Sequence, residues 1–458
     1  MTLRFSRVIR AASLLAGFAL AMSCAGTAHA VPSFARQTGA ECAACHVGSY
    51  GPHLTAYGIM FKLGGYTDTG GDKGKDAVPL AMHLRLLNSK PAQGSSTTQI
   101  DEASVYLAGR LTDNIGSFIE ARREENPNGQ TAPVNTYLRN LDLRYVREAK
   151  LGGKDTLFGV TLNNSPGVQD PIDANQIWGF PAIATDGSLF NPTVAGQLPR
   201  RVLGLTGYAY MDKAWYGEFG AYRTMPRNLQ NNLGLNPEAN DPGAIDGIAP
   251  YWRLAYIRDF KSQMVSFGIY GMTAEKQLAV LSPPGAPRVT SRSGPADKLR
   301  DVGFDATYQY RGDRSNTLQL RANYVDEHRD YGSTPTVFGF TAGPTGKVRE
   351  STLSATYSFN ETWSATAARM QTRTSQDAVR YLNGTADSDI KYFNVMWVPF
   401  GKETSWGAPF ANLRLMAEWL RFGKFNGASN DLFGARFGGP LVNARDLNTF
   451  NLSASIAF

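Results

Sequence analysis

The feature that most constrains the fold of this chain is an alternation of apolar and polar residues, which recurs from about residue 81 to the end. In residues 301–310 every second residue is apolar, and residues 318–324 and 353–359 repeat the pattern. Successive side chains of a β-strand point to opposite faces, so such a strand has one apolar and one polar face. The pattern predicts β-structure, in either a soluble sandwich or a membrane barrel.

The number of segments and the lengths of their connections favour the barrel. Tight turns such as Asp212-Lys213 and Asn360-Glu361 alternate with long loops such as 163–200 and 273–300. An even number of strands of about ten residues with this rhythm of connections is typical of outer-membrane barrels. The sixteen predicted strands are 81–88, 102–111, 114–122, 136–147, 155–162, 201–211, 214–224, 251–259, 262–272, 301–311, 316–327, 350–359, 362–373, 388–399, 410–422 and 447–458.

The composition fits an all-β membrane protein and excludes several other classes. Only 19% of the 458 residues are charged and only three are cysteines, which excludes a charged disordered chain and a disulfide scaffold. A mean hydropathy of −0.28 excludes a bundle of transmembrane helices, whereas the alternating strands of a barrel average to mild polarity. The last strand ends on Phe458, which resembles the signal read by the outer-membrane barrel assembly machinery, an expected partner.

Residues 1–30 are predicted to be a signal peptide. Three arginines are followed by an apolar stretch at 11–22 and by Ala28-His29-Ala30, which has the form of a signal peptidase site. We expect cleavage before Val31 and export from a bacterial cytoplasm. The alternative is a lipoprotein site at Cys24, but Ala21 stands where such sites usually have Leu. The remaining 43 basic and 39 acidic residues form no run of like charge, so no nucleic-acid partner is expected.

The two cysteines that remain form a C-x-x-C-H motif with Cys42, Cys45 and His46. This spacing predicts one covalently attached haem c, with a thioether at each cysteine and His46 as the proximal ligand of the iron. A structural zinc site would need a second pair of ligands, and the sequence has no second Cys pair. A redox dithiol normally follows a strand of a βαβ unit, whereas this motif lies close to the new N-terminus.

The region from 31 to 78 is predicted to be a small helical module around this motif. One helix of about three turns is expected to start at Pro52 and to stop at Gly64-Gly65. With fewer than fifty residues, the module needs the haem and the rest of the protein for a core. His46 and His53 share a face of a regular helix, so both can bind iron only if the chain reverses at Gly51-Pro52. The sixth ligand stays open among Met60, Met82, His53 and His83.

The whole chain resembles the fused monohaem cytochrome and porin family of bacterial outer membranes, best known from iron oxidisers. The specific likeness runs from Val31 through Cys42, Cys45 and His46 to Thr67, and elsewhere it is architectural. The resemblance implies a haem module seated in a sixteen-stranded barrel, which passes electrons across the membrane, commonly from extracellular ferrous iron. The chain departs from the family at Gly58-Ile59-Met60, where a basic residue usually follows the glycine.

The expected organisation is a signal peptide (1–30), a haem module (31–78) that plugs the lumen or faces the periplasm, and an outer-membrane barrel (79–458). The expected function is electron transfer between an extracellular donor, with Fe(II) as a candidate, and a periplasmic carrier such as a soluble cytochrome. The alternatives are a transport porin with a haem-containing plug or redox gate, and a periplasmic haem enzyme on a soluble scaffold. No catalytic residues are assigned, because no Ser-His-Asp or paired-carboxylate site can be assembled from the sequence.

Overall fold

The computed structural model describes residues 33–123, 136–174, 191–194, 198, 201–235, 243–278, 294–312, 315–334, 343–402, 404–407, 411–432 and 441–458. The predicted signal peptide and Cys24 lie outside these residues. Within the described ranges, no helix is both long enough and apolar enough to cross a membrane.

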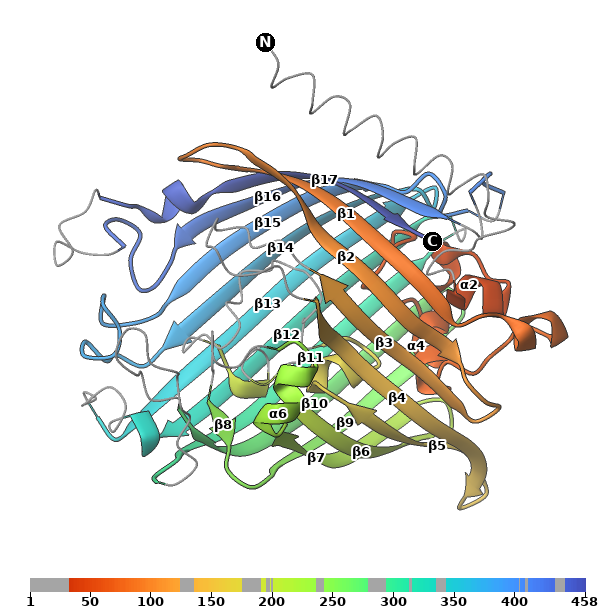
Figure 1. Ribbon diagram of the computed structural model, residues 1–458, viewed down its shortest axis with the longest axis horizontal. Helices are drawn as coiled ribbons and strands as arrows, with labels where there is room; N and C mark the ends of the chain where they lie inside the picture. Colours follow the sequence, from red (N-terminus) through yellow and green to blue (C-terminus); the bar gives the residue numbers. More distant parts are fainter. Residues whose placement is uncertain are drawn as a thin grey trace, which may run out of the picture.

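Sixteen long antiparallel strands form one closed sheet in the described part of the chain (Figure 1). Each pairs with its neighbours in sequence, and β1 pairs with β17 to close the barrel. This confirms the predicted fold. The strands are β1 (Leu80–Pro91), β2 (Thr97–Arg110), β3 (Ile115–Arg123), β4 (Thr136–Leu151), β5 (Lys154–Asn163), β6 (Val202–Met211), β7 (Trp215–Thr224), β9 (Ala249–Asp259), β10 (Gln263–Gln277), β11 (Asp297–Arg311), β12 (Thr317–Asp330), β13 (Thr345–Phe359), β14 (Trp363–Thr374), β15 (Ser388–Trp397), β16 (Asn412–Lys424) and β17 (Thr449–Ala457), with a two-residue β8 (Ala244–Ile245) beside β10.

The connections divide the barrel into a short-turn end and a long-loop end. At Asp212-Lys213 and at Asn360-Glu361 both central residues have positive φ, between 51° and 58°. This is the type I′ geometry, whose twist matches that of two paired strands. The tight turns predicted from the sequence therefore pin the register of the β6–β7 and β13–β14 hairpins.

The two faces of the wall differ as the alternation predicts. Large apolar side chains such as Leu205 and Phe219 point outward and are 62% and 68% exposed. Many charged side chains point into the lumen, where Arg144 and Arg253 are fully buried. An apolar outer band on a closed barrel is the surface that a bilayer covers.

Tyrosines that pack over glycines help to fill the lumen. The ring of Tyr222 lies over Gly204, its partner on the neighbouring strand, and a Cβ on that glycine would stand 2.2 Å from the ring. Tyr208 covers Gly159 in the same way. Because an aromatic ring occupies the space of the missing side chain, these glycines are required by packing rather than by backbone conformation.

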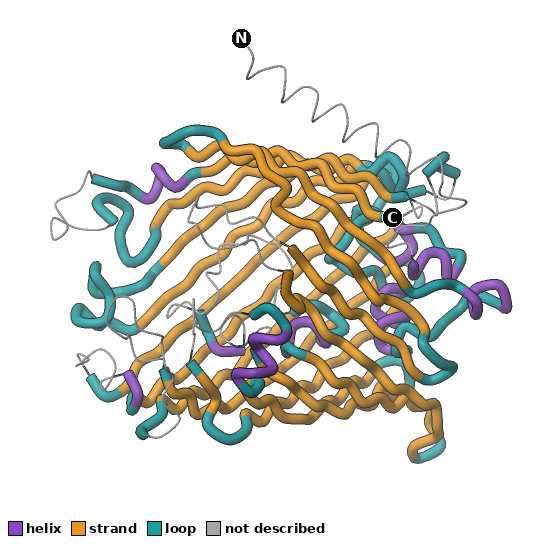
Figure 2. Tube along the Cα trace, viewed as in Figure 1, coloured by secondary structure: helices purple, strands orange, loops and turns teal. Residues whose placement is uncertain are grey.

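Residues 33–79, here called the mouth segment, lie at the short-turn end of the barrel (Figures 1 and 2). The segment contains α2 (Ser33–Thr38), α3 (Cys42–Cys45), α4 (Ala56–Leu63) and the 3-10 helix η1 (Asp72–Asp76). It bonds to inward side chains from widely separated strands. These bonds are Tyr66 Oη to Asp142 Oδ2 on β4 (2.7 Å), Tyr208 Oη on β6 to Leu63 O (2.5 Å), Gln309 Nε2 on β11 to Leu54 O (2.6 Å) and Asn412 Nδ2 on β16 to Ser49 O (2.9 Å). The segment therefore fills the mouth of the barrel.

The helix predicted to start at Pro52 is shorter than expected. Helix α4 begins only at Ala56 and has eight residues. Thr55 is its N-cap, because the Thr55 hydroxyl accepts a hydrogen bond from Gly58 N (3.2 Å) and donates one to Ala44 O. Pro52 belongs instead to the preceding turn, in which the chain reverses, and Gly64 ends the helix as predicted.

We predict that Gly204→Ala destabilises the barrel by about 1–3 kcal/mol, because its methyl group overlaps the fully buried Tyr222 ring. Gly207→Ala on the same strand is the control, since the nearest atom to its Cβ is 3.9 Å away. The measurement is urea unfolding in detergent micelles. Equal unfolding midpoints for the two variants would refute the packing role of Gly204.

Candidate functional site

The C-x-x-C-H motif forms a single helical turn, α3, inside the mouth segment. The Cys42 and Cys45 thiols are free and half-buried. Burial raises the pKa of Cys42 to about 11 and that of Cys45 to about 12. Both side chains therefore stay protonated at neutral pH, which disfavours a reactive redox dithiol, since the thiolate is the nucleophile.

His46 follows this turn and starts a reversal of the chain. His46 and Leu54 form an isolated antiparallel bridge, and Val47 N donates to His53 O at 2.9 Å. The reversal considered at Gly51-Pro52 is therefore present. Burial lowers the pKa of His46 to about 4, so the ring is neutral, which is the form that ligates a metal. Its Nδ1 is buried and has no hydrogen-bond partner among the described residues.

Helix α4 is pressed against the Cys42–Cys45 turn. A Cβ on Gly58 would stand 2.3 Å from the carbonyl oxygen of Cys45, so only glycine permits this contact. Thr55 N also donates to Cys45 O at 2.9 Å. Contacts with α4 therefore hold the backbone of the motif in place without the help of a cofactor.

The four candidates for a sixth ligand lie in different surroundings. His53 is in the reversal, and its Nδ1 contacts the Arg321 guanidinium on β12. His83 on β1 points inward, with its ring 6.1 Å from that of Tyr50. Met82 points outward on β1 and is 47% exposed, and Met60 is exposed on α4. The structure thus places His53 in the reversal that starts at His46 and His83 beside Tyr50, whereas Met82 lies on the other side of the wall.

A loop folds into the lumen above the mouth segment. Residues 164–174, here called the lumen loop, include α5 (Pro166–Gln169) and are buried. The Lys62 ammonium of α4 donates to Val168 O at 2.6 Å and to Asp170 O at 2.8 Å. Sequence reasoning placed this stretch in an ordinary long loop, and no local pattern marks Lys62 as a buried clamp.

Arginines from the wall hold the lumen loop. Arg253 on β9 lies 3.6 Å from Asp170 and 2.7 Å from Asp305, with all three side chains buried. Arg321 donates to the carbonyls of Ile172 and Asp173 as well as contacting His53. Because an unpaired buried charge is costly, each arginine fixes the position of its partners. Arg321 thereby ties the reversal after His46 to the lumen loop.

The residues of the motif fit a covalently attached haem. Two free thiols at the required spacing are followed directly by a neutral imidazole that has a buried and unpartnered nitrogen. A haem supplies four nitrogen ligands of its own and needs only axial ligands and thioether links from the chain. Cys42, Cys45 and His46 would hold it.

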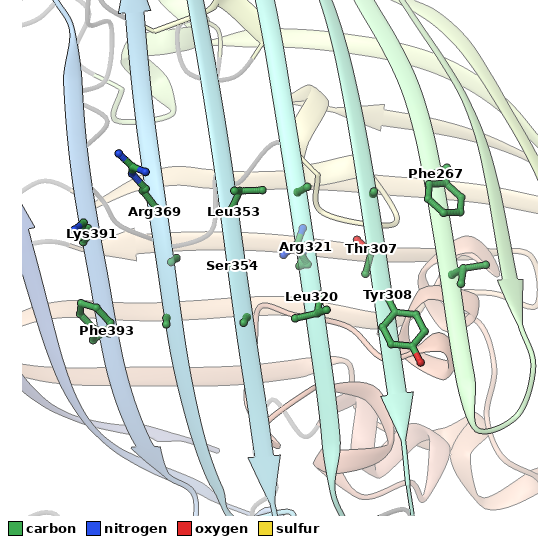
Figure 3. A pocket seen from close by; sticks show the side chains of 16 residues that line it. Phe267, Thr307, Tyr308, Leu320, Arg321, Leu353, Ser354, Arg369, Lys391 and Phe393 are labelled. Carbon is green, nitrogen blue, oxygen red and sulfur yellow. The ribbon is translucent and has the colours of Figure 1, made fainter.

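An apolar hollow of about 610 Å³ lies over strands β10–β15 and is separate from this site (Figure 3). Larger apolar side chains alternate there with small ones. They include Phe267, Leu320, Leu353 and Phe393, with Ala306, Ala322, Ala355 and Ala367 between them. Such a surface is mostly apolar and suits the acyl chains of lipids, although Arg369 and Lys391 also line it.

No protein-family model and no curated protein matches this chain. Several solved structures are similar in fold. OmpF of Salmonella typhi, in complex with daunomycin, is 12% identical over 83% of this chain and 97% of its own, with a TM-score of 0.46. The trimer form of in-vitro folded OmpT, an outer membrane protein of Vibrio cholerae, is 12% identical over 83% and 98%, with a TM-score of 0.44. The anion-selective porin from Comamonas acidovorans is 12% identical over the same shares, with a TM-score of 0.43.

We predict that Lys62→Met loosens the lumen loop, because Val168 O and Asp170 O lose their buried donor. The cost should be about 1–3 kcal/mol, with faster cleavage of the folded protein in limited proteolysis. Lys154→Met is the matched control, since this lysine is 53% exposed and makes one ion pair of 3.3 Å. Cleavage of both variants at the wild-type rate would contradict the clamp.

Proposed function

We propose that this chain is an outer-membrane electron-transfer protein that carries one haem c in the mouth of its barrel. It transfers electrons between an extracellular donor, for which Fe(II) is the first candidate, and a periplasmic carrier such as a soluble cytochrome. The observation that carries the proposal is the position of the C-x-x-C-H turn. Cys42, Cys45 and His46 belong to the mouth segment, which bonds to inward side chains of β4, β11 and β16, and do not form a separate domain.

This position suits transfer between two compartments. The hydrocarbon band of such barrels is about 25 Å tall, so a single cofactor serves both sides only if it sits within the wall. Short turns of these barrels face the periplasm. The mouth segment lies at the short-turn end and would therefore be within reach of a periplasmic carrier.

The chain's own residues orient the site. Gly58 and Thr55 hold α4 against the turn, and Asn412 Nδ2 on β16 donates to Ser49 O at 2.9 Å. Arg321 anchors the reversal to the lumen loop. The haem, when bound, supplies one-electron chemistry at its iron, and the protein supplies its position and surroundings.

We predict that Cys42→Ala/Cys45→Ala abolishes haem-stained electrophoretic signal in outer-membrane fractions while the barrel still assembles. The reason is that no thiol remains for thioether formation. His328→Ala is the control, because His328 lies on β12 near the long-loop end and is 38% exposed. Absence of covalent haem in the unmodified protein would overturn the proposal.

The donor is tested by reduced-minus-oxidised spectra of intact cells after addition of ferrous iron. Reduction of the haem by external iron is expected if Fe(II) is the donor. A haem that is present but is not reduced by added ferrous iron would exclude Fe(II) as the donor. The proposal of an electron-transfer site would still stand.

A transport porin with a haem-containing plug or redox gate is the second candidate. The observation in its favour is a lumen lined by charged side chains, including Arg122, Glu120 and Glu102 on β2 and β3. The position of the mouth segment argues against a transport porin, because this segment bonds to strands all around the short-turn end.

Planar-bilayer conductance separates these two functions. We predict a low conductance for the full chain, because the mouth segment and the lumen loop occupy the lumen. A variant lacking residues 33–78, exported behind the same signal, should conduct at least tenfold better if it folds, with folding checked by its heat-modifiable mobility. A high conductance of the full chain would favour the transport porin.

A further inference from the structure

His83 has an environment unlike that of any other histidine in the described part of the chain. It lies on β1, faces the lumen and is more than nine-tenths buried. Its Nδ1 is 2.7 Å from Glu102 Oε1 on the neighbouring strand. Its Nε2 is also buried and has no hydrogen-bond partner among the described residues.

The partner of Nδ1 determines which nitrogen carries the lone pair. A carboxylate can only accept, so Nδ1 of His83 carries the proton and donates it to Glu102. In the neutral ring, Nε2 then holds an unprotonated lone pair. A carboxylate behind one nitrogen, with the other nitrogen free, is the arrangement that orients metal-binding histidines.

His53 has the opposite arrangement. Its Nδ1 faces the guanidinium of Arg321, which can only donate. Nδ1 of His53 must therefore accept, and the proton of the neutral ring lies on Nε2. The nitrogen that would reach a metal is thus protonated in His53 and free in His83.

The ring of His83 lies beside Tyr50, in the segment that follows the motif. The Tyr50 ring, four residues after His46, is 6.1 Å from the ring of His83, and Arg414 covers Tyr50 at 4.3 Å. Three atoms here are buried without partners among the described residues, namely Nδ1 of His46, Oη of Tyr50 and Nε2 of His83. Buried polar atoms are normally bonded, so the unpartnered Nε2 of His83 is free to bind a group that lies beside Tyr50.

We infer that His83 is the distal axial ligand of the haem, with Glu102 as its positioning residue. This inference rests on the proposed function, because it needs the haem at Cys42 and Cys45. Glu102 is itself fixed by Arg122 at 2.9 Å and by the Ser104 hydroxyl at 3.2 Å. The ring of His83 is therefore held in one orientation by three side chains of β2 and β3.

The test uses the full chain, purified with its haem in detergent. The wild type should show a low-spin ferric spectrum and slow binding of carbon monoxide in the ferrous form. His83→Ala should become high-spin and bind carbon monoxide at least tenfold faster. Added imidazole should restore the low-spin spectrum, which separates loss of a ligand from loss of folding.

Matched variants address the other candidates. Met82→Leu changes the residue before His83, which faces outward, and Met60→Leu and His53→Ala remove the remaining candidates. All three should keep the low-spin spectrum. Glu102→Gln should keep it too but raise the reduction potential, because a weaker acceptor behind Nδ1 makes the ring a poorer donor to the iron.

The outcomes separate the two claims. A haem that stays low-spin in His83→Ala would overturn the distal assignment and leave the proposed function intact. Loss of the low-spin spectrum in Met60→Leu or His53→Ala, with His83→Ala unchanged, would move the ligand to that residue. A wild-type protein without covalent haem, shown by the pyridine haemochrome assay, would overturn the proposed function and this inference together.

Discussion

The structure depends on the closure of β1 onto β17. In a hydrocarbon phase every backbone N–H and C=O needs a partner, and a closed sheet is the only way for strands to provide one. Phe458 N donates to Met82 O at 2.9 Å and Met82 N donates to Phe458 O at 2.7 Å, so the ladder continues to the last residue. Closure with sixteen strands makes a lumen too wide for wall side chains alone to fill. The chain fills it with the mouth segment and the lumen loop.

Hydrogen bonds and ion pairs of buried charged groups fix the positions of the mouth segment and the lumen loop. A helix such as α4 cannot bury Lys62 against a purely apolar wall, and here the ammonium is satisfied by two carbonyls of the lumen loop. Arg144 on β4 binds Asp142 at 2.8 Å and donates to Lys62 O at 3.2 Å. The mouth segment, the lumen loop and the wall are therefore one network, in which each part satisfies charges that another part brings. Tyr66 extends this network to the aromatic cluster around Phe34.

Local sequence signals predicted what depends on local physics. Alternation and turn chemistry placed all sixteen strands, because the side of the wall on which a residue lies follows from its parity. The motif likewise marks Cys42, Cys45 and His46 without reference to the fold. The start of α4 was missed because Pro52 is a common first residue of helices, while the reversal that displaces it is fixed by contacts with Cys45. The contact of Lys62 with the lumen loop spans more than a hundred residues, and no local pattern encodes it.

The same reasoning explains why the sequence alone could not narrow the four candidates for the sixth ligand to one. Parity alone separates Met82 from its neighbour His83, since adjacent residues of a strand face opposite sides. Parity does not separate His83 from His53, because the difference lies in what stands behind each ring. A carboxylate behind one and a guanidinium behind the other reverse the tautomer. Two imidazoles of equal intrinsic basicity thus differ in which nitrogen carries the proton, and for His83 the neighbour responsible is set by the pairing of β1 with β2.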